Sequence, residues 1–128
     1  IPATTSTVVP ITLGLESNGG IALLDSNSKL IPLRLGDFIN ADFSITVVTP
    51  SGTDHYINID FVVSGVTYRS VTFPLIKGVG IEENCSVSFG LPVGTDFFTN
   101  GGTFKVYSDV SVVIKNRYIA VSLIHKAL

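Results

Sequence analysis

The fold class follows from one stretch, residues 55–73, which reads HYINIDFVVSGVTYRSVTF. Two runs rich in β-branched and aromatic residues flank the pair Ser64-Gly65, and the first run alternates apolar with polar side chains. Two such runs joined by a two-residue turn that contains glycine are typical of a β-hairpin. We therefore predict two long antiparallel strands, residues 55–63 and 66–73.

Working outward, short β-type segments recur along the whole chain, separated by Gly, Asn, Asp, Ser and Pro. They lie at residues 7–13, 21–24, 29–35, 43–49, 86–89, 104–107, 110–114 and 118–124. The polar turn at 25–28 predicts a second hairpin, and residues 36–42 are the one stretch that suits a helical turn. About ten strands in 128 residues predict a single all-β domain spanning residues 1–128, an antiparallel sandwich or jelly roll.

Composition narrows the classes of partner. The chain is 45% hydrophobic and 14% charged, and its eight Lys and Arg residues are scattered, with a net charge of −2. A nucleic-acid-binding surface needs clustered cations, so nucleic acid is not an expected partner. No apolar run approaches the roughly 20 residues that a membrane span needs, which predicts a soluble fragment. The chain opens Ile1-Pro2-Ala3 and contains no Met, and we expect it to be the C-terminal part of a longer protein.

Four segments break the alternation expected of a strand with one wet face. They are apolar at consecutive positions: 47–48, 61–63, 112–114 and 119–121. Because a sandwich covers only its inner faces, such runs predict that a neighbouring subunit covers an outer face, as in a cyclic homo-oligomer. The alternative is that a bulge or an end loop covers these positions within one chain.

The acidic and thiol side chains give no pattern of catalysis. Cys85 shares its side of the strand with Val87 and Phe89, which predicts a buried structural thiol. Glu82 and Glu83 are adjacent and would point to opposite faces of a strand, so they fit a solvated turn better than an acid–base pair.

Two further pairs of residues are weak candidates, one for a catalytic site and one for a metal site. Asp54 precedes His55, but adjacent residues rarely orient one another, and no motif places a Ser nucleophile beside them. Asp37 and Asp42 are the one hint of a metal site, and loop carboxylates facing water explain them better. We expect no enzyme activity, no metal and no cofactor.

Cationic side chains offer a binding interpretation. Arg34 and Arg69 each lie beside apolar or aromatic residues in a predicted strand, and Lys77 and Arg117 are further candidates. Any of them at a groove between subunits could hold a small carboxylate or an acidic sugar by bidentate hydrogen bonds. The alternative is an ion pair, within or between subunits, with Asp42, Asp60 or Glu82.

The aromatic pair Phe97-Phe98 lies in a glycine-flanked loop. We expect these rings to close one end of the sandwich. Exposure of the rings at the tip of an assembly would instead indicate contact with a host surface.

The chain as a whole resembles the trimeric jelly rolls of the tumour-necrosis-factor type: it has no disulfide, has this length and ends on an apolar strand. More narrowly, residues 86–128 are similar to the terminal knob of the tail needle of short-tailed bacteriophages. The likeness lies in the Gly-rich turn, in Asn116-Arg117-Tyr118 and in the basic tail His125-Lys126. The tumour-necrosis-factor relatives usually close on a Phe-Gly-Phe-Leu-like strand. This chain closes on VSLI at 121–124, which favours a viral relative over a cytokine.

The resemblance implies a homotrimeric cap on a trimeric shaft at the tail tip of a virion. Such a cap helps to plug the portal vertex and contacts or penetrates the host cell envelope, through shape and stability and without bond-making. Two other classes stay open: a carbohydrate-binding jelly-roll module of a larger protein, and a secreted cytokine-like ligand.

Overall fold

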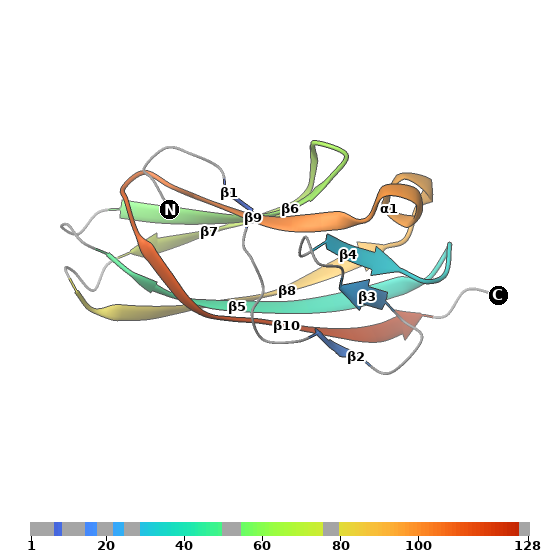
Figure 1. Ribbon diagram of the computed structural model, residues 1–128, viewed down its shortest axis with the longest axis horizontal. Helices are drawn as coiled ribbons and strands as arrows, with labels where there is room; N and C mark the ends of the chain where they lie inside the picture. Colours follow the sequence, from blue (N-terminus) through green and yellow to red (C-terminus); the bar gives the residue numbers. More distant parts are fainter. Residues whose placement is uncertain are drawn as a thin grey trace.

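The computed structural model describes residues 7–8, 15–17, 22–24, 29–49, 55–75 and 80–125. In this part of the chain the fold is all-β, with two sheets stacked as layers of a sandwich (Figure 1). The six-stranded sheet holds β1 (Thr7–Val8), β3 (Ala22–Leu24), β4 (Lys29–Pro32), β6 (His55–Val63), β7 (Val66–Leu75) and β9 (Gly102–Ser108). The four-stranded sheet holds β2 (Leu15–Ser17), β5 (Phe38–Val48), β8 (Glu82–Pro92) and β10 (Val113–His125). One short helix, α1 (Thr95–Asn100), connects β8 to β9.

The order of strands is β3-β4-β9-β6-β7 in the six-stranded sheet, and β1 pairs with the later part of β9. In the four-stranded sheet the order is β2-β10-β5-β8. Every pair is antiparallel except β2 with β10, which run parallel over three residue pairs. The predicted antiparallel sandwich is therefore confirmed as an all-β, two-sheet architecture.

Both predicted hairpins are confirmed. β6 and β7 pair from His55 opposite Leu75 to Val63 opposite Val66. The turn residues Ser64 and Gly65 both have positive φ, 50° and 76°, as a two-residue type I′ turn requires. β3 pairs with β4 as expected. The turns predicted at 25–28 and 50–54 lie outside the described residues, as does most of the segment predicted at 7–13.

The core lies between the sheets and is rich in phenylalanine. Phe43 of β5 stacks on Phe104 of β9 with ring centroids 4.4 Å apart and planes 2° apart, which joins the two layers. Phe61 of β6 lies 5.0 Å from Phe104 and 5.2 Å from Phe97 of α1. These four rings are buried, and each buried ring stabilises the fold by roughly 1.5–3 kcal/mol. The predicted burial of Cys85 is confirmed, at 2% exposed.

Two local predictions are wrong. The helical turn expected at 36–42 is absent, because β5 starts at Phe38 and its inward positions Ile39 and Ala41 are buried. The helix lies at 95–100 instead. Residues 115–117, expected as a turn between two strands, form a bulge within one long strand, β10. Asn116 has a φ of 51° there, and the register shifts between Lys115 and Tyr118.

The four apolar runs do not produce a continuous apolar outer face. Their inward members are buried, as at Val47, Phe61 and Ile119, while outward members such as Val62 and Ala120 are half-buried within the chain itself. Around them the outer faces are polar, with Asn40, Asp42, Ser44, Ser86, Ser88 and Ser122 on one sheet and Asn58, Asp60, Ser70 and Thr72 on the other. The apolar surplus therefore goes mainly into the core. Val113, at the start of β10, is an exception with 55% of its surface exposed.

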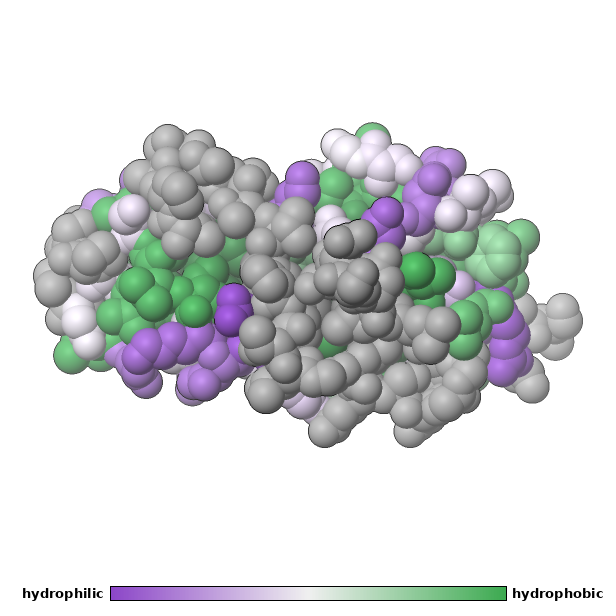
Figure 2. Space-filling model, in the orientation of Figure 1, coloured by the Kyte–Doolittle hydropathy of each residue, from purple (hydrophilic) through white to green (hydrophobic). Residues whose placement is uncertain are grey.

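Exposed apolar side chains gather at the end of the sandwich that carries α1. They are Leu33, Leu35, Val66 and Phe98. In the view of Figure 2, hydrophobic atoms show at this right-hand end and, between the two layers, at the left-hand end. In the described part of the chain no helix is long and apolar enough to span a membrane.

Candidate functional site

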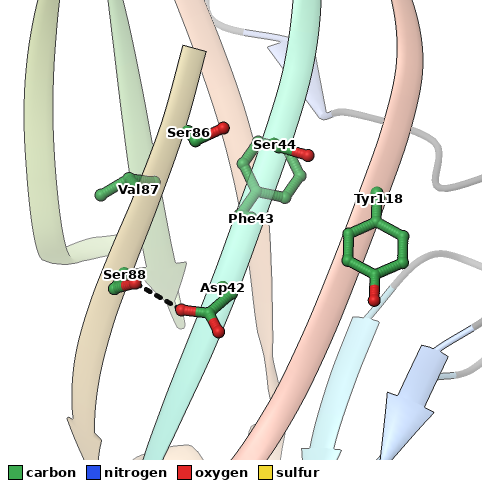
Figure 3. A pocket seen from close by; sticks show the side chains of 7 residues that line it. All are labelled: Asp42, Phe43, Ser44, Ser86, Val87, Ser88 and Tyr118. Carbon is green, nitrogen blue, oxygen red and sulfur yellow. Dashed lines mark hydrogen bonds between the residues drawn. The ribbon is translucent and has the colours of Figure 1, made fainter. Parts of the chain in front are cut away.

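The outer face of the four-stranded sheet is hollowed by a shallow trough of about 370 Å³ (Figure 3). We call it the hydroxyl trough and define it by the polar side chains that line it: Asp42, Ser44, Ser86, Ser88 and Tyr118. Phe43 and Val87 also line it, but their side chains pack against the core on the other side of the sheet. The polar groups that line the trough are therefore hydroxyls and one carboxylate, and apolar atoms form the rest of its surface.

Strand register explains why these side chains meet. Ser44 of β5 lies opposite Ser86 of β8 and opposite Tyr118 of β10, and Asp42 lies opposite Ser88. Directly opposed residues on one face of a sheet hold their Cβ atoms about 4.5–5.5 Å apart. Three adjacent strands thus present hydroxyl groups side by side, on a rigid surface.

Hydrogen bonds fix the carboxylate of the trough. Oδ1 of Asp42 accepts the hydroxyl of Ser88 and, at 2.8 Å, an amide hydrogen of Asn40. In Figure 3 the Asp42 side chain and the Ser88 hydroxyl point toward each other across β5 and β8. A serine nucleophile would need a nearby base such as imidazole. His55 belongs to the other sheet, where its Nδ1 contacts Asp109 at 3.0 Å. The hydroxyls and the carboxylate of the trough can form hydrogen bonds to a polar group.

Arg69, one of the predicted cations, has two hydrogen bonds to backbone carbonyls and a ring contact. Its Nε donates to the carbonyl of Gly90 at 3.0 Å and its guanidinium carbon lies 5.4 Å from the centroid of the Tyr68 ring. A second guanidinium nitrogen donates to the carbonyl of Tyr68 at 2.9 Å. Arg69 therefore ties β7 to β8 across the edge of the two sheets. Within the described part of the chain, two backbone carbonyls and a ring hold it.

The other predicted cations lie on different segments of the chain. Arg34 is exposed and follows the end of β4 at Pro32, so the expectation that a strand holds it is wrong. Lys77 lies outside the described residues. Arg117 lies in the bulge of β10, half-buried, and its Nε is buried without a hydrogen-bond partner among the described residues. Arg34, Arg69 and Arg117 thus belong to three separate segments of the chain.

The two predicted aromatic residues have different environments. Phe97 is fully buried and packs on Phe61 and, at 5.8 Å, on Tyr68, so it closes one end of the core as expected. Phe98, the next residue of α1, is 39% exposed. Only Phe98 is available for a surface contact.

Several residues differ from what the sequence predicted. Asp37 and Glu83, expected to face water, are 2% and 7% exposed. His55 pairs with Asp109, 54 positions away, a partner that the sequence did not indicate. The serines of the trough were not predicted as a site. A signal was present, because the alternation in Ser86-Val87-Ser88 places both hydroxyls on one face of the strand.

Among the described residues no group of three or more His, Cys, Asp or Glu side chains could hold a metal ion. The chain matches no protein-family model, and comparisons with curated proteins and with solved structures also give no match.

Proposed function

We propose that the chain is a non-catalytic jelly-roll knob that assembles as a homotrimer at the distal end of a phage tail needle or fibre. The observation that carries this proposal is the nesting of strand pairs: β2 with β10, β4 with β9, β5 with β8 and β6 with β7. In this arrangement each pair encloses the next pair along the sequence. A long hairpin that rolls up into a jelly roll has the same arrangement, and the jelly roll is an architecture of viral capsid and lectin domains. The parallel run of β2 on β10 departs from that scheme.

Fold by itself does not assign function. The step from jelly roll to knob is an analogy that rests on the resemblance of residues 86–128 to the needle knobs of short-tailed phages. By that analogy the trimer caps a trimeric shaft at the tail tip of the virion, helps to plug the portal vertex and contacts or penetrates the host cell envelope.

The outer face of the four-stranded sheet is the surface that best suits trimer contacts. Val113 is exposed on the same sheet opposite Val48, and a subunit contact would cover it. The small serines of the hydroxyl trough would let a neighbour approach closely.

Thiol labelling tests this face directly. Ser86 and Thr72 are both exposed in the single chain, on the outer faces of opposite sheets. We expect the thiol of Ser86→Cys to react at least about tenfold more slowly than that of Thr72→Cys when the protein is concentrated, because the trimer covers it. The native Cys85 gives little background, because burial raises its pKa to about 11. Equal rates for both variants at every concentration would rule out this face as the interface.

A further inference from the structure

The outer face of the six-stranded sheet carries a pair of tyrosines. Tyr56 of β6 and Tyr107 of β9 have ring centroids 6.1 Å apart and planes tilted by 33°. Both point away from the core, since Ile57, Val106 and Ser108 beside them are buried. A hydrogen bond between the two phenols is the main cause of a raised pKa of Tyr56. Tyr56 is 37% exposed, so the pair offers an aromatic surface to solvent.

Polar side chains extend this surface along β6 and across its two neighbours, β7 and β9. Asn58 lies opposite both Tyr107 and Thr72, and the next outward residue, Asp60, lies opposite both Lys105 and Ser70. The register thus places two rows of three side chains across β7, β6 and β9.

Hydrogen bonds within these rows orient the side chains and leave some donors and acceptors available for a ligand. The Thr72 hydroxyl donates to Oδ1 of Asn58 at 2.6 Å, so the side-chain NH₂ of Asn58 stays available as a donor. The Ser70 hydroxyl donates to Oδ1 of Asp60, which leaves Oδ2 as an acceptor. Lys105 adds three ammonium donors beside Asp60, and their opposite charges make the patch neutral overall.

We propose that this patch, the tyrosine platform (Tyr56, Asn58, Asp60, Thr72, Lys105 and Tyr107), binds a neutral pyranose unit of a surface glycan. A pyranose ring has an apolar face of C–H groups, which stacks on aromatic side chains, and a rim of hydroxyls that both donate and accept hydrogen bonds. The tyrosines supply the ring surface, and Asn58, Asp60 and Lys105 supply donors and acceptors beside it.

The balance of charge and the rigidity of the site favour this ligand class. An anionic ligand would meet the carboxylate of Asp60, and a cationic one the ammonium of Lys105. Side chains on paired strands are already ordered, so binding sacrifices little side-chain entropy, which matters for a weak, hydrated ligand.

The tyrosine platform lies on the sheet opposite to the face proposed for trimer contacts, and it would point outward from a trimer. The inference deepens the proposed contact with the host cell by naming the chemistry of what is contacted. It rests on that proposed function only for its biological setting, since sugar binding and trimer formation are measured separately.

The test uses the full 128-residue chain and three neutral probes: cellotetraose, maltotetraose and chitotetraose, each titrated to about 10 mM in ¹H–¹⁵N NMR. We expect amide shifts that cluster on β6, β7 and β9 for at least one probe. Tyr107→Ala should weaken that binding by roughly tenfold or more, and Asn58→Ala should weaken it in the same direction.

Two controls separate binding from folding. Tyr107→Phe keeps the ring and should bind within about threefold of the wild type, and a native-like NMR spectrum shows that each variant is folded. Val66→Ala truncates an exposed side chain at the β6–β7 turn, at the other end of β6 from Tyr56, and should leave sugar affinity unchanged.

The inference is overturned if none of the three sugars shifts the amides of β6, β7 and β9, or if Val66→Ala weakens binding as much as Tyr107→Ala. A trimer that binds no sugar would overturn this inference alone. A monomer that binds sugar at the platform would overturn the trimeric knob and leave the inference standing.

Discussion

The Nδ1 atom of His55 lies 3.0 Å from Oδ2 of Asp109, and Oδ1 of the same carboxylate accepts the amide hydrogen of Tyr56 at 3.1 Å. One side chain from the segment that follows β9 thus holds the first two residues of β6. Ser108 adds a third link, because its hydroxyl donates to the carbonyl of Tyr56. This clasp anchors the strand that carries half of the tyrosine platform.

The clasp makes stability depend on pH. Partial burial works against the charge on Asp109, but the hydrogen bonds from His55 and the Tyr56 amide outweigh it and lower the pKa of Asp109 below its usual 3.8. A carboxyl with a lowered pKa stabilises the fold above its unfolded pKa, and this contribution is lost as the pH falls through the folded pKa. Asp109→Asn should therefore lower the free energy of unfolding by about 0.5–1.5 kcal/mol near pH 6, by loss of hydrogen bonds to a charged acceptor. Urea unfolding of both proteins should show the difference shrinking below pH 3.8. A difference that stays constant down to about pH 2 would contradict this account of the clasp.

Phe97 and Phe98 form a natural matched pair. Phe97→Ala should lower the free energy of unfolding by about 3–5 kcal/mol, because it removes a fully buried ring that packs on Phe61 and Tyr68. Phe98→Ala should cost under about 1 kcal/mol, since that ring is 39% exposed. Denaturant unfolding of the two variants measures both values, and similar losses would mean that α1 is packed differently.

Two glycines separate steric clash from backbone conformation. A Cβ on Gly102 would lie 2.2 Å from a ring carbon of the buried Phe61, so Gly102→Ala should lower the free energy of unfolding by about 1–3 kcal/mol or more. Gly65 has a φ of 76° and open space around it, and Gly65→Ala should cost only about 1–2 kcal/mol, from the left-handed conformation. Thermal or urea unfolding would refute the packing at Gly102 if its variant proved as stable as the wild type.

Cys85 should be nearly inert in the folded protein. Burial raises its pKa from the usual 9.0 to about 11, so only about 0.1% of the thiol is ionised at pH 8, and the sulfur is inaccessible as well. A chromogenic disulfide reagent should therefore label the native protein far more slowly than the protein in urea. Rapid labelling under native conditions would show that β8 opens readily.

Local sequence signals predicted the parts of the fold that depend on neighbours in the chain. The Ser64-Gly65 turn fixes its hairpin because a two-residue turn needs positive φ at both positions, and glycine supplies one of them cheaply. Alternation around Cys85 likewise identified its inward face. The prediction of a helical turn at residues 36–42 was wrong because the apolar residues Ile39, Ala41 and Phe43 alternate with polar residues that are also common in turns.

The hydroxyl trough and the tyrosine platform could not be predicted in the same way, because register between distant strands creates them. The pairs Asp42 with Ser88 and Tyr56 with Tyr107 join residues 46 and 51 positions apart, and nothing in either segment identifies its partner. Consecutive apolar residues in a strand predict that both of its faces are buried. In the structure, outward residues such as Val62 are already half-buried within the single chain.

The central claim is that this chain assembles as a trimer, and the most direct test is its solution mass by light scattering on a sizing column at several dilutions. The account predicts three copies of the 13.6 kDa chain, persisting as the protein is diluted. A stable monomer of 13.6 kDa at every concentration would contradict it.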